Sequence, residues 1–163
     1  MIHELAAQVQ MKAHTLVTLT RAGIVHPERP DHIFHTVRAL LRYGTTPAAG
    51  YTAAARKFPD APAVIDELGT LSFREIDERT NALARALRAD GIEEGDGVAI
   101  MCRNHRGWIE SVLACSKLGA NALFLNTAFS GPQLTDVAKR EKPKAIVFDQ
   151  EFAEVLADAG KRR

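Results

Sequence analysis

The second half of the sequence alternates between short apolar runs and amphipathic segments, and this alternation constrains the fold more than any other feature. Three apolar runs typical of buried strands lie at residues 95–102, 121–125 and 144–149. Each is followed by a segment with helical spacing of apolar residues, at 106–119, 131–140 and 151–159. Such alternation favours right-handed crossovers and a mainly parallel sheet flanked by helices. The sequence therefore predicts an α/β fold.

A short hairpin and a capped helix are expected just before this alternation. Residues 63–73 read AVIDELGTLSF, with apolar residues on both sides of a polar turn, which predicts two short strands. Ser72 and Glu75 have the spacing of a capping box, so a helix is expected to begin there. Gly91 is able to adopt positive φ just past its end. The predicted buried stripe of this helix contains Ile76, Leu83 and Leu87.

The front of the chain differs from the rest in charge. Residues 1–57 carry seven Lys/Arg and three Asp/Glu, a net charge of +4, whereas residues 58–163 carry fourteen and seventeen, a net charge of −3. This difference divides the chain into a basic, amphipathic, helical leader at 1–57 and an incomplete α/β subdomain at 58–163. No cluster of Lys/Arg interleaves with aromatic residues, so a nucleic-acid partner is not expected.

Within the leader, residues 30–43 have the pattern of an amphipathic helix. The apolar residues at helical spacing are Ile33, Phe34, Val37, Leu40 and Leu41. This helix is expected either to pack on the body of the protein or to lie in a membrane interface, where the basic residues of the leader would give weak contact with anionic lipid. A shorter, Ala-rich helix is predicted at residues 52–58.

Three features of the sequence indicate the cellular compartment of the protein. Cys102 and Cys115 lie in apolar segments without metal-ligand spacing, so both are expected to be reduced core residues, with a disulfide as the alternative. The first twelve residues include Glu4 and no continuous apolar run, which argues against a secretory signal. The charge-free stretch at 118–135 contains Gly, Asn and Pro, which a bilayer core would not accept. We expect a cytoplasmic protein, either free or peripheral at the inner membrane surface.

Two positions at predicted strand ends are candidates for ligand contact. Asn126 and Thr127 leave the carboxyl end of the strand at 121–125, where ligands of parallel sheets gather. Ser130 and Gln133 form a second capping-box pattern, so turning the corner is favoured over ligand binding there. His105 opens the helix at 106–119, where it either contacts an anion or caps the helix, and capping is favoured.

Other motifs do not develop into sites. The Gly-Asp-Gly at 95–97 is followed by a strand and lacks a third glycine, so it is no dinucleotide fingerprint, and no phosphate-binding P-loop is present. His26, His32 and His35 lack a partner Cys or a well-spaced carboxylate, so a metal site is not expected. No nucleophile-and-base set is visible. We therefore assign no catalytic or metal residues and leave the cofactor-binding residues unknown.

Two stretches resemble the start of the AMP-forming adenylating enzymes, the superfamily of acyl-CoA synthetases, luciferases and peptide synthetases. Residues 71–76, LSFREI, are similar to the signature LTY-x-EL, with Ile76 for Leu and Phe73 for Tyr. Residues 116–126, SKLGANALFLN, are similar to L-K-x-G-x-x-x-x-P-x-(N/D), with Phe124 where Val or Pro is usual. The resemblance covers about residues 47–159.

The resemblance implies the N-terminal part of a larger enzyme. The leader is similar to that of actinobacterial fatty-acyl-CoA synthetases, which implies a parent that converts a fatty acid, ATP and coenzyme A to acyl-CoA, AMP and pyrophosphate, with Mg²⁺ on the phosphates. The phosphate loop, nucleotide contacts, Mg²⁺ carboxylate and C-terminal lysine of the family have no counterpart before Arg163. The chain alone is therefore expected to bind no cofactor and to be inactive. The alternative is a standalone, non-catalytic interaction or membrane-surface module. Strands without neighbours would also favour self-association through an exposed sheet edge.

Overall fold

The computed structural model describes residues 11, 14, 17, 18, 20, 21 and 28–161 of the 163-residue chain. It divides the chain into two compact units, Met1–Ile33 and Phe34–Arg163, and each is described by itself. His26 and Glu4, which entered the sequence argument, lie outside the described residues. The predicted boundary between residues 57 and 58 stays a prediction.

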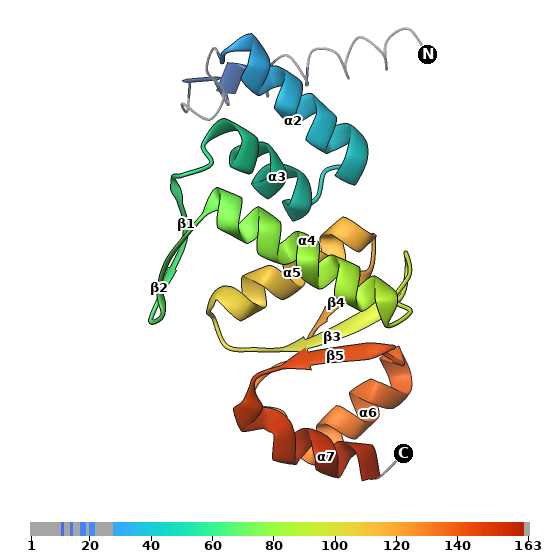
Figure 1. Cartoon of the computed structure of the whole chain (residues 1–163). Helices are drawn as coiled ribbons and strands as arrows, with labels where there is room; N and C mark the ends of the chain where they lie inside the picture. The colour runs from blue at the N-terminus through green and yellow to red at the C-terminus, as the bar shows by residue number, and fades with distance from the viewer. Residues whose placement is uncertain (1–10, 12–13, 15–16, 19, 22–27, 162–163) are drawn as a thin grey trace, which may run out of the picture. The chain divides into compact units, whose positions relative to one another are not determined.

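The elements follow the predicted order (Figure 1). They are α2 (Pro30–Tyr43), α3 (Pro47–Lys57), β1 (Pro62–Asp66), β2 (Gly69–Ser72), α4 (Phe73–Ala89), β3 (Gly97–Met101), α5 (Arg106–Leu118), β4 (Asn121–Phe124), α6 (Gly131–Glu141), β5 (Ala145–Phe148), the 3-10 turn η1 (Gln150–Phe152) and α7 (Ala153–Lys161). The strand–helix alternation of the second half is thereby confirmed. One difference is α3, which begins at Pro47 rather than at the predicted Thr52, because proline suits the first helical turn.

The central sheet confirms the predicted α/β class. Strands β4, β3 and β5 lie in that order and all run parallel, with Val98 of β3 opposite Ala122 on one side and Ala145 on the other. Helices α4 and α5 cover one face of this sheet, and α6 and α7 cover the other (Figure 1). Strand β3 is therefore enclosed on both faces, as its uninterrupted apolar sequence requires.

Side chains at alternate positions of β3 pack into two different hydrophobic clusters, one on each face of the sheet. Val98 and Ile100 of β3, and Cys102 directly after it, pack with α4 and α5, whereas Met101 packs with Leu134 of α6 and Phe152. The period of two along a strand accounts for this division. Cys102 and Cys115 are both buried and free, which confirms their prediction as core residues. Burial raises the pKa of each thiol to about 11, so neither is a ready nucleophile.

The hairpin and the capped helix are also as predicted. Strands β1 and β2 pair antiparallel, with Asp66 opposite Gly69, whose φ of 103° suits the tight turn. The Ser72 hydroxyl accepts from the Glu75 N–H at 3.3 Å, and the Glu75 carboxylate accepts from the Ser72 N–H at 2.8 Å. This reciprocal pair is the predicted capping box.

Helix α2 packs on α3 through small residues. Ala39 is buried against Ala49 and Ala53, with Tyr43 packed beside them. The larger apolar residues of the predicted stripe lie on another side of α2 and are exposed: Phe34, Val37, Leu40 and Leu41. The side of α2 that contacts the body is thus not the side that the apolar pattern marks. Within the part of the chain that the structure describes, no helix combines the length and apolar character needed to cross a membrane.

Candidate functional site

The carboxyl ends of the three parallel strands meet at one edge of the sheet, the edge at which ligands of such sheets bind. Polar residues follow each strand there. Arg103 and His105 come after β3, Asn126 comes after β4, and Asp149 comes directly after β5. The Asp149 carboxylate contacts both Arg103 and His105 and therefore links β5 to the segment after β3.

Asp149 joins the end of β5 to the start of α5. Its Oδ2 accepts a hydrogen bond from the Arg103 backbone N–H at 2.7 Å, and its Oδ1 lies 2.9 Å from Nε2 of His105. Burial opposes ionisation of this carboxyl, but the Arg103 N–H and the His105 ring together lower its pKa below the ordinary value. Asp149 is therefore a carboxylate at neutral pH, held on both oxygens.

The contacts of His105 fix its tautomer. Its Nδ1 accepts a hydrogen bond from the Gly107 N–H at 2.9 Å, so the ring proton of the neutral form sits on Nε2 and is donated to Asp149. His105 is the N-cap residue of α5, which confirms capping, the favoured interpretation. Since both ring nitrogens are engaged, the ring has no nitrogen left for the anion contact that was the alternative.

The charge of the Arg103 side chain is paired with Glu151 and not with Asp149. Its guanidinium donates to both carboxylate oxygens of Glu151, with Nη2 at 2.7 Å from Oε2, and lies over the ring of Phe152 at 5.5 Å. Sequence inspection singled out neither Asp149 nor Arg103. The signal that could have found Asp149 is its position as the last, charged residue of the predicted strand at 144–149, a position at the carboxyl edge like that of Asn126.

The segment after β4 turns the corner. Oδ1 of Asn126 accepts from the Ala128 N–H at 2.9 Å, and the Asn126 carbonyl accepts from the Phe129 N–H at 3.0 Å. Oε1 of Gln133 accepts from the N–H of Ser130 at 2.8 Å and from its hydroxyl at 2.9 Å. These contacts agree with the corner-turning interpretation of Asn126 and Ser130. Thr127 is half-buried, and a ligand role for it stays untested.

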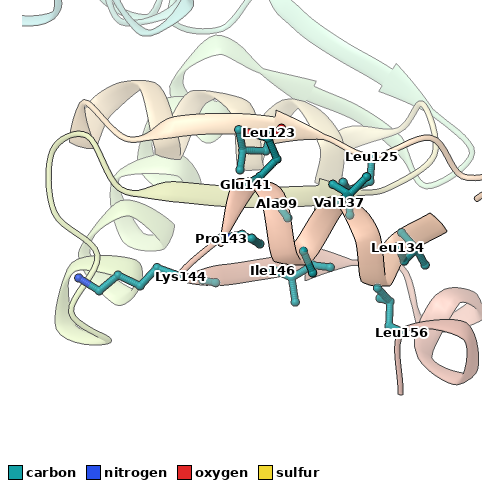
Figure 2. Close-up of a pocket in the computed structure, with 12 residues that line it drawn as sticks. Ala99, Leu123, Leu125, Leu134, Val137, Glu141, Pro143, Lys144, Ile146 and Leu156 are labelled. Atoms are coloured by element: carbon teal, nitrogen blue, oxygen red, sulfur yellow. The ribbon is translucent and has the colours of Figure 1, made fainter. Parts of the chain in front are cut away.

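One cavity, of about 250 Å³, lies between α6 and the face of the sheet formed by β4, β3 and β5 (Figure 2). Its lining is mostly apolar, with Leu123, Val137 and Ile146 among the lining residues. Lys144 also lines it, but its ammonium extends away from the apolar side chains and binds Asp96 at 2.7 Å. This cavity suits an apolar group and offers little to a phosphate.

A second cavity of about 240 Å³ lies between the hairpin and the start of α5. Ile65 and Trp108 contribute apolar surface, and His105 lies at the same cavity. Asp66, another lining residue, is bound by Arg106, whose Nε lies 2.8 Å from Oδ2 and whose backbone N–H lies 3.0 Å from the same oxygen. This ion pair anchors the hairpin to α5 and holds the pKa of Asp66 well below its usual range.

Contacts within the chain engage the charged side chains at the carboxyl edge of the sheet. Asp149 binds His105, and Arg103 binds Glu151. In the described part of the chain, no group of three His, Cys, Asp or Glu side chains is placed to hold a metal ion. The ends of these strands are thus closed by contacts within the chain.

The sequence pattern of the AMP-binding enzyme family matches residues 51–163, more than half of the chain. The chain belongs to this family. The matched part is an N-terminal portion of it, and the parallel sheet described above agrees with the N-terminal fold of adenylating enzymes.

Relatives show how much of a family member is present. A feruloyl-CoA synthase from an Amycolatopsis species is 33% identical over 63% of this chain and 21% of its own length. The fatty acid–[acyl-carrier-protein] ligase ScoC of Streptomyces coeruleorubidus is 26% identical over 60% of this chain and 19% of its own length. A solved structure from Rhodopseudomonas palustris, described as a long-chain-fatty-acid CoA ligase, is 28% identical with a TM-score of 0.68, and covers 72% of this chain and 30% of that one. The chain thus spans about a fifth of the length of the curated relatives.

The signature residues of the resemblance have structural tasks in this family member. The Lys117 ammonium is buried and donates to Asp77 Oδ1 at 2.6 Å, Thr80 Oγ1 at 2.8 Å and Asn81 Oδ1 at 2.8 Å, all on α4. Gly119 ends α5 with φ of 74°, and a Cβ there would meet Glu94 at 2.9 Å. These two signature residues are therefore explained by packing of α4, α5 and the next strand.

Proposed function

We propose that this chain is the N-terminal part of an AMP-forming fatty-acyl-CoA synthetase, which converts a fatty acid, ATP and coenzyme A to acyl-CoA, AMP and pyrophosphate. The family match over residues 51–163 carries this proposal. The choice of a fatty acid is supported by the Streptomyces relative and the Rhodopseudomonas structure, both described as fatty acid ligases. The buried, free thiols of Cys102 and Cys115 favour a reducing, cytoplasmic setting.

The contribution of this portion to the reaction is positional. The carboxyl edge of the sheet, with Asp149 holding the start of α5, forms one wall on which further elements of the parent would assemble. The nucleotide, Mg²⁺ and coenzyme A would be held by residues of the parent outside this chain. The chain by itself is accordingly expected to be inactive.

The test is an ATP–pyrophosphate exchange assay, run on this chain and on a longer parent protein. We expect exchange that depends on a fatty acid in the parent and none in the chain. Exchange by the chain alone would show that its residues do form a nucleotide site and would contradict the proposal. Ferulate serves as the control acid. A parent that used ferulate in place of fatty acids would still be an acyl-CoA ligase, and only the proposed fatty-acid substrate would be wrong.

A second candidate is a standalone, non-catalytic interaction module, and the exposed apolar side of α2 is the observation that favours it. The coding sequence after Arg163 separates the two. A loop like Thr-Ser-Gly-Thr-Thr-Gly within about one domain length would support the synthetase, and a stop codon at that position would support the module.

We also propose that the isolated chain self-associates through an open sheet edge. In the described residues, β4 and β5 each pair with β3 alone, so their outer edges have no strand partner. Phe148 of β5 is exposed there. Light scattering at increasing concentration should show a rising mass that Phe148→Lys reduces, because a charge on an edge strand opposes pairing. A wild-type chain that stays monomeric at high concentration would contradict this.

A further inference from the structure

Helix α2 exposes a continuous apolar surface that no other part of the Phe34–Arg163 unit covers. Phe34 is 61% exposed and Leu41 is 84% exposed, and Val37 and Leu40 are exposed beside them. At 100° per residue these four lie within one third of the helix circumference. We call this set, Phe34, Val37, Leu40 and Leu41, the α2 face.

The α2 face is not needed to hold the helix in place. Ala39 and Tyr43 make the contact with α3, and helical spacing puts them on the side of α2 away from Phe34. Large apolar side chains that are exposed as a contiguous patch are unusual in monomeric proteins, and they mark an interaction surface.

The flank of the α2 face is basic. Arg38 and Arg42 follow Phe34 and Leu41 around the helix, and both are exposed. The Arg42 guanidinium lies over the ring of Tyr43 at 5.1 Å, so its charge is directed toward the Tyr43 side of the helix. An apolar strip bordered by arginines matches the layered chemistry of a bilayer surface, with acyl chains below and phosphates above.

The charges of Arg38 and Arg42 favour an anionic lipid surface over a second copy of the chain as the partner of the α2 face. A second copy of the chain docked face to face would place Arg38 and Arg42 near their counterparts, and these like charges would repel. Anionic headgroups would instead neutralise them. A helix of 14 residues is about 21 Å long, too short to cross a bilayer but sufficient to lie along its surface.

We propose that the α2 face docks on the surface of an anionic phospholipid bilayer, with Phe34 and Leu41 in the boundary between headgroups and acyl chains and with Arg38 and Arg42 at lipid phosphates. A single short helix gives weak, reversible attachment. The proposal does not depend on the proposed synthetase reaction, because it uses only the geometry of α2.

The experiment is flotation of the full chain with vesicles of phosphatidylcholine alone and of phosphatidylcholine mixed with phosphatidylglycerol. We expect binding to the mixed vesicles at low salt and its loss at high salt. Phe34→Ser/Leu41→Ser should weaken binding by about tenfold or more through lost apolar burial. Arg38→Gln/Arg42→Gln should weaken it by roughly tenfold or more and remove the preference for phosphatidylglycerol.

Two matched controls lie elsewhere on the surface. Leu68→Ser removes an apolar residue that is 80% exposed in the hairpin turn, and Arg85→Gln/Arg88→Gln removes two exposed charges from α4. Both control proteins should bind vesicles as the wild type does. If they weaken binding as much as the α2 variants, attachment is not specific to the α2 face and the proposal is wrong.

Three other results would also overturn it. Absence of flotation at low salt would exclude lipid as the occupant. Variants of the α2 face that reduce self-association in light scattering while leaving flotation unchanged would assign the face to a second copy. Variants that lower the melting temperature by several degrees would show that the face is covered by the rest of the chain. An inactive parent enzyme would leave all of these outcomes unchanged.

Discussion

Helices α5 and α2 differ in which side chains they bury. Helix α5 buries the charged side chain of Lys117, which is 3% exposed, whereas α2 leaves the apolar side chains of Phe34 and Leu41 mostly in solvent. Both helices have a clear apolar stripe in the sequence. Polarity of a side chain alone therefore does not decide its burial in this protein.

The neighbours of each helix account for the difference. Lys117 faces Asp77, Thr80 and Asn81 of α4, which provide enough acceptors to replace water around its ammonium. Burial lowers the pKa of Lys117, and the hydrogen bond that its ammonium donates to Asp77 works against that shift. Among the described residues of α2, Ala39 is buried against the alanines of α3, which are too small to cover the larger apolar side chains of α2.

The largest effect should come from breaking the buried pair. Lys117→Met leaves the Asp77 carboxylate buried without its cation, which typically costs about 3–5 kcal/mol in the free energy of unfolding. Urea denaturation followed by circular dichroism measures this loss. Asp77→Asn combined with Lys117→Met should recover part of it, because a neutral amide needs no cation. If Lys117→Met alone were as stable as the wild type, the Lys117 ammonium would contribute nothing to α4–α5 packing.

The next effect depends on pH and concerns Asp66. Because Arg106 lowers the folded-state pKa below the ordinary 3.8, this pair stabilises the fold fully above that pH and less as pH falls through the folded pKa. Asp66→Asn should therefore destabilise the chain at neutral pH, and its difference from wild type should shrink in acid. Thermal unfolding at a series of pH values tests this. A difference that is constant down to strong acid would contradict the ion pair.

Loss of the α5 cap should have a smaller effect. His105→Ala removes the acceptor for the Gly107 N–H, which typically costs about 1 kcal/mol of stability. His105→Asn keeps a capping oxygen at this position and should retain most of the stability. Equal losses in the two variants would show that the contact with Asp149, and not the cap, is what His105 contributes.

The smallest effect is expected at an exposed ion pair, which provides the matched contrast to Asp66. Arg74 lies 2.8 Å from Asp60, and both side chains are well exposed. Solvent screens such pairs, so Arg74→Gln should change the free energy of unfolding by less than about 0.5 kcal/mol. A loss approaching that of Lys117→Met would break the distinction between buried and exposed charge drawn above.

The order of elements could be predicted almost completely from the sequence. Capping boxes at Ser72 and Ser130 and the glycines at positions 91 and 119 mark helix ends through contacts between residues close in the chain. The start of α3 was missed by five residues, because the Gly-Pro-Ala composition there is also typical of a loop.

The site was harder to predict, since its contacts join residues far apart. The capping role of His105 was found from its position before α5, but its partner Asp149 lies 44 residues away. Lys117 and Asp77 are separated by 40 residues, as are Arg106 and Asp66. No local pattern records such pairs, and without their partners a buried lysine and an exposed one look the same in the sequence.

The sequence by itself determined the alternation of strands and helices and the helix ends, because periodicity and spacing act over a few residues, and its resemblance to the adenylating enzymes indicated the family. Only the tertiary structure decided which charges are buried, how the strand ends are closed and which side of α2 faces solvent. Those outcomes depend on which distant side chains meet and on whether they supply enough hydrogen bonds or apolar contact to replace water.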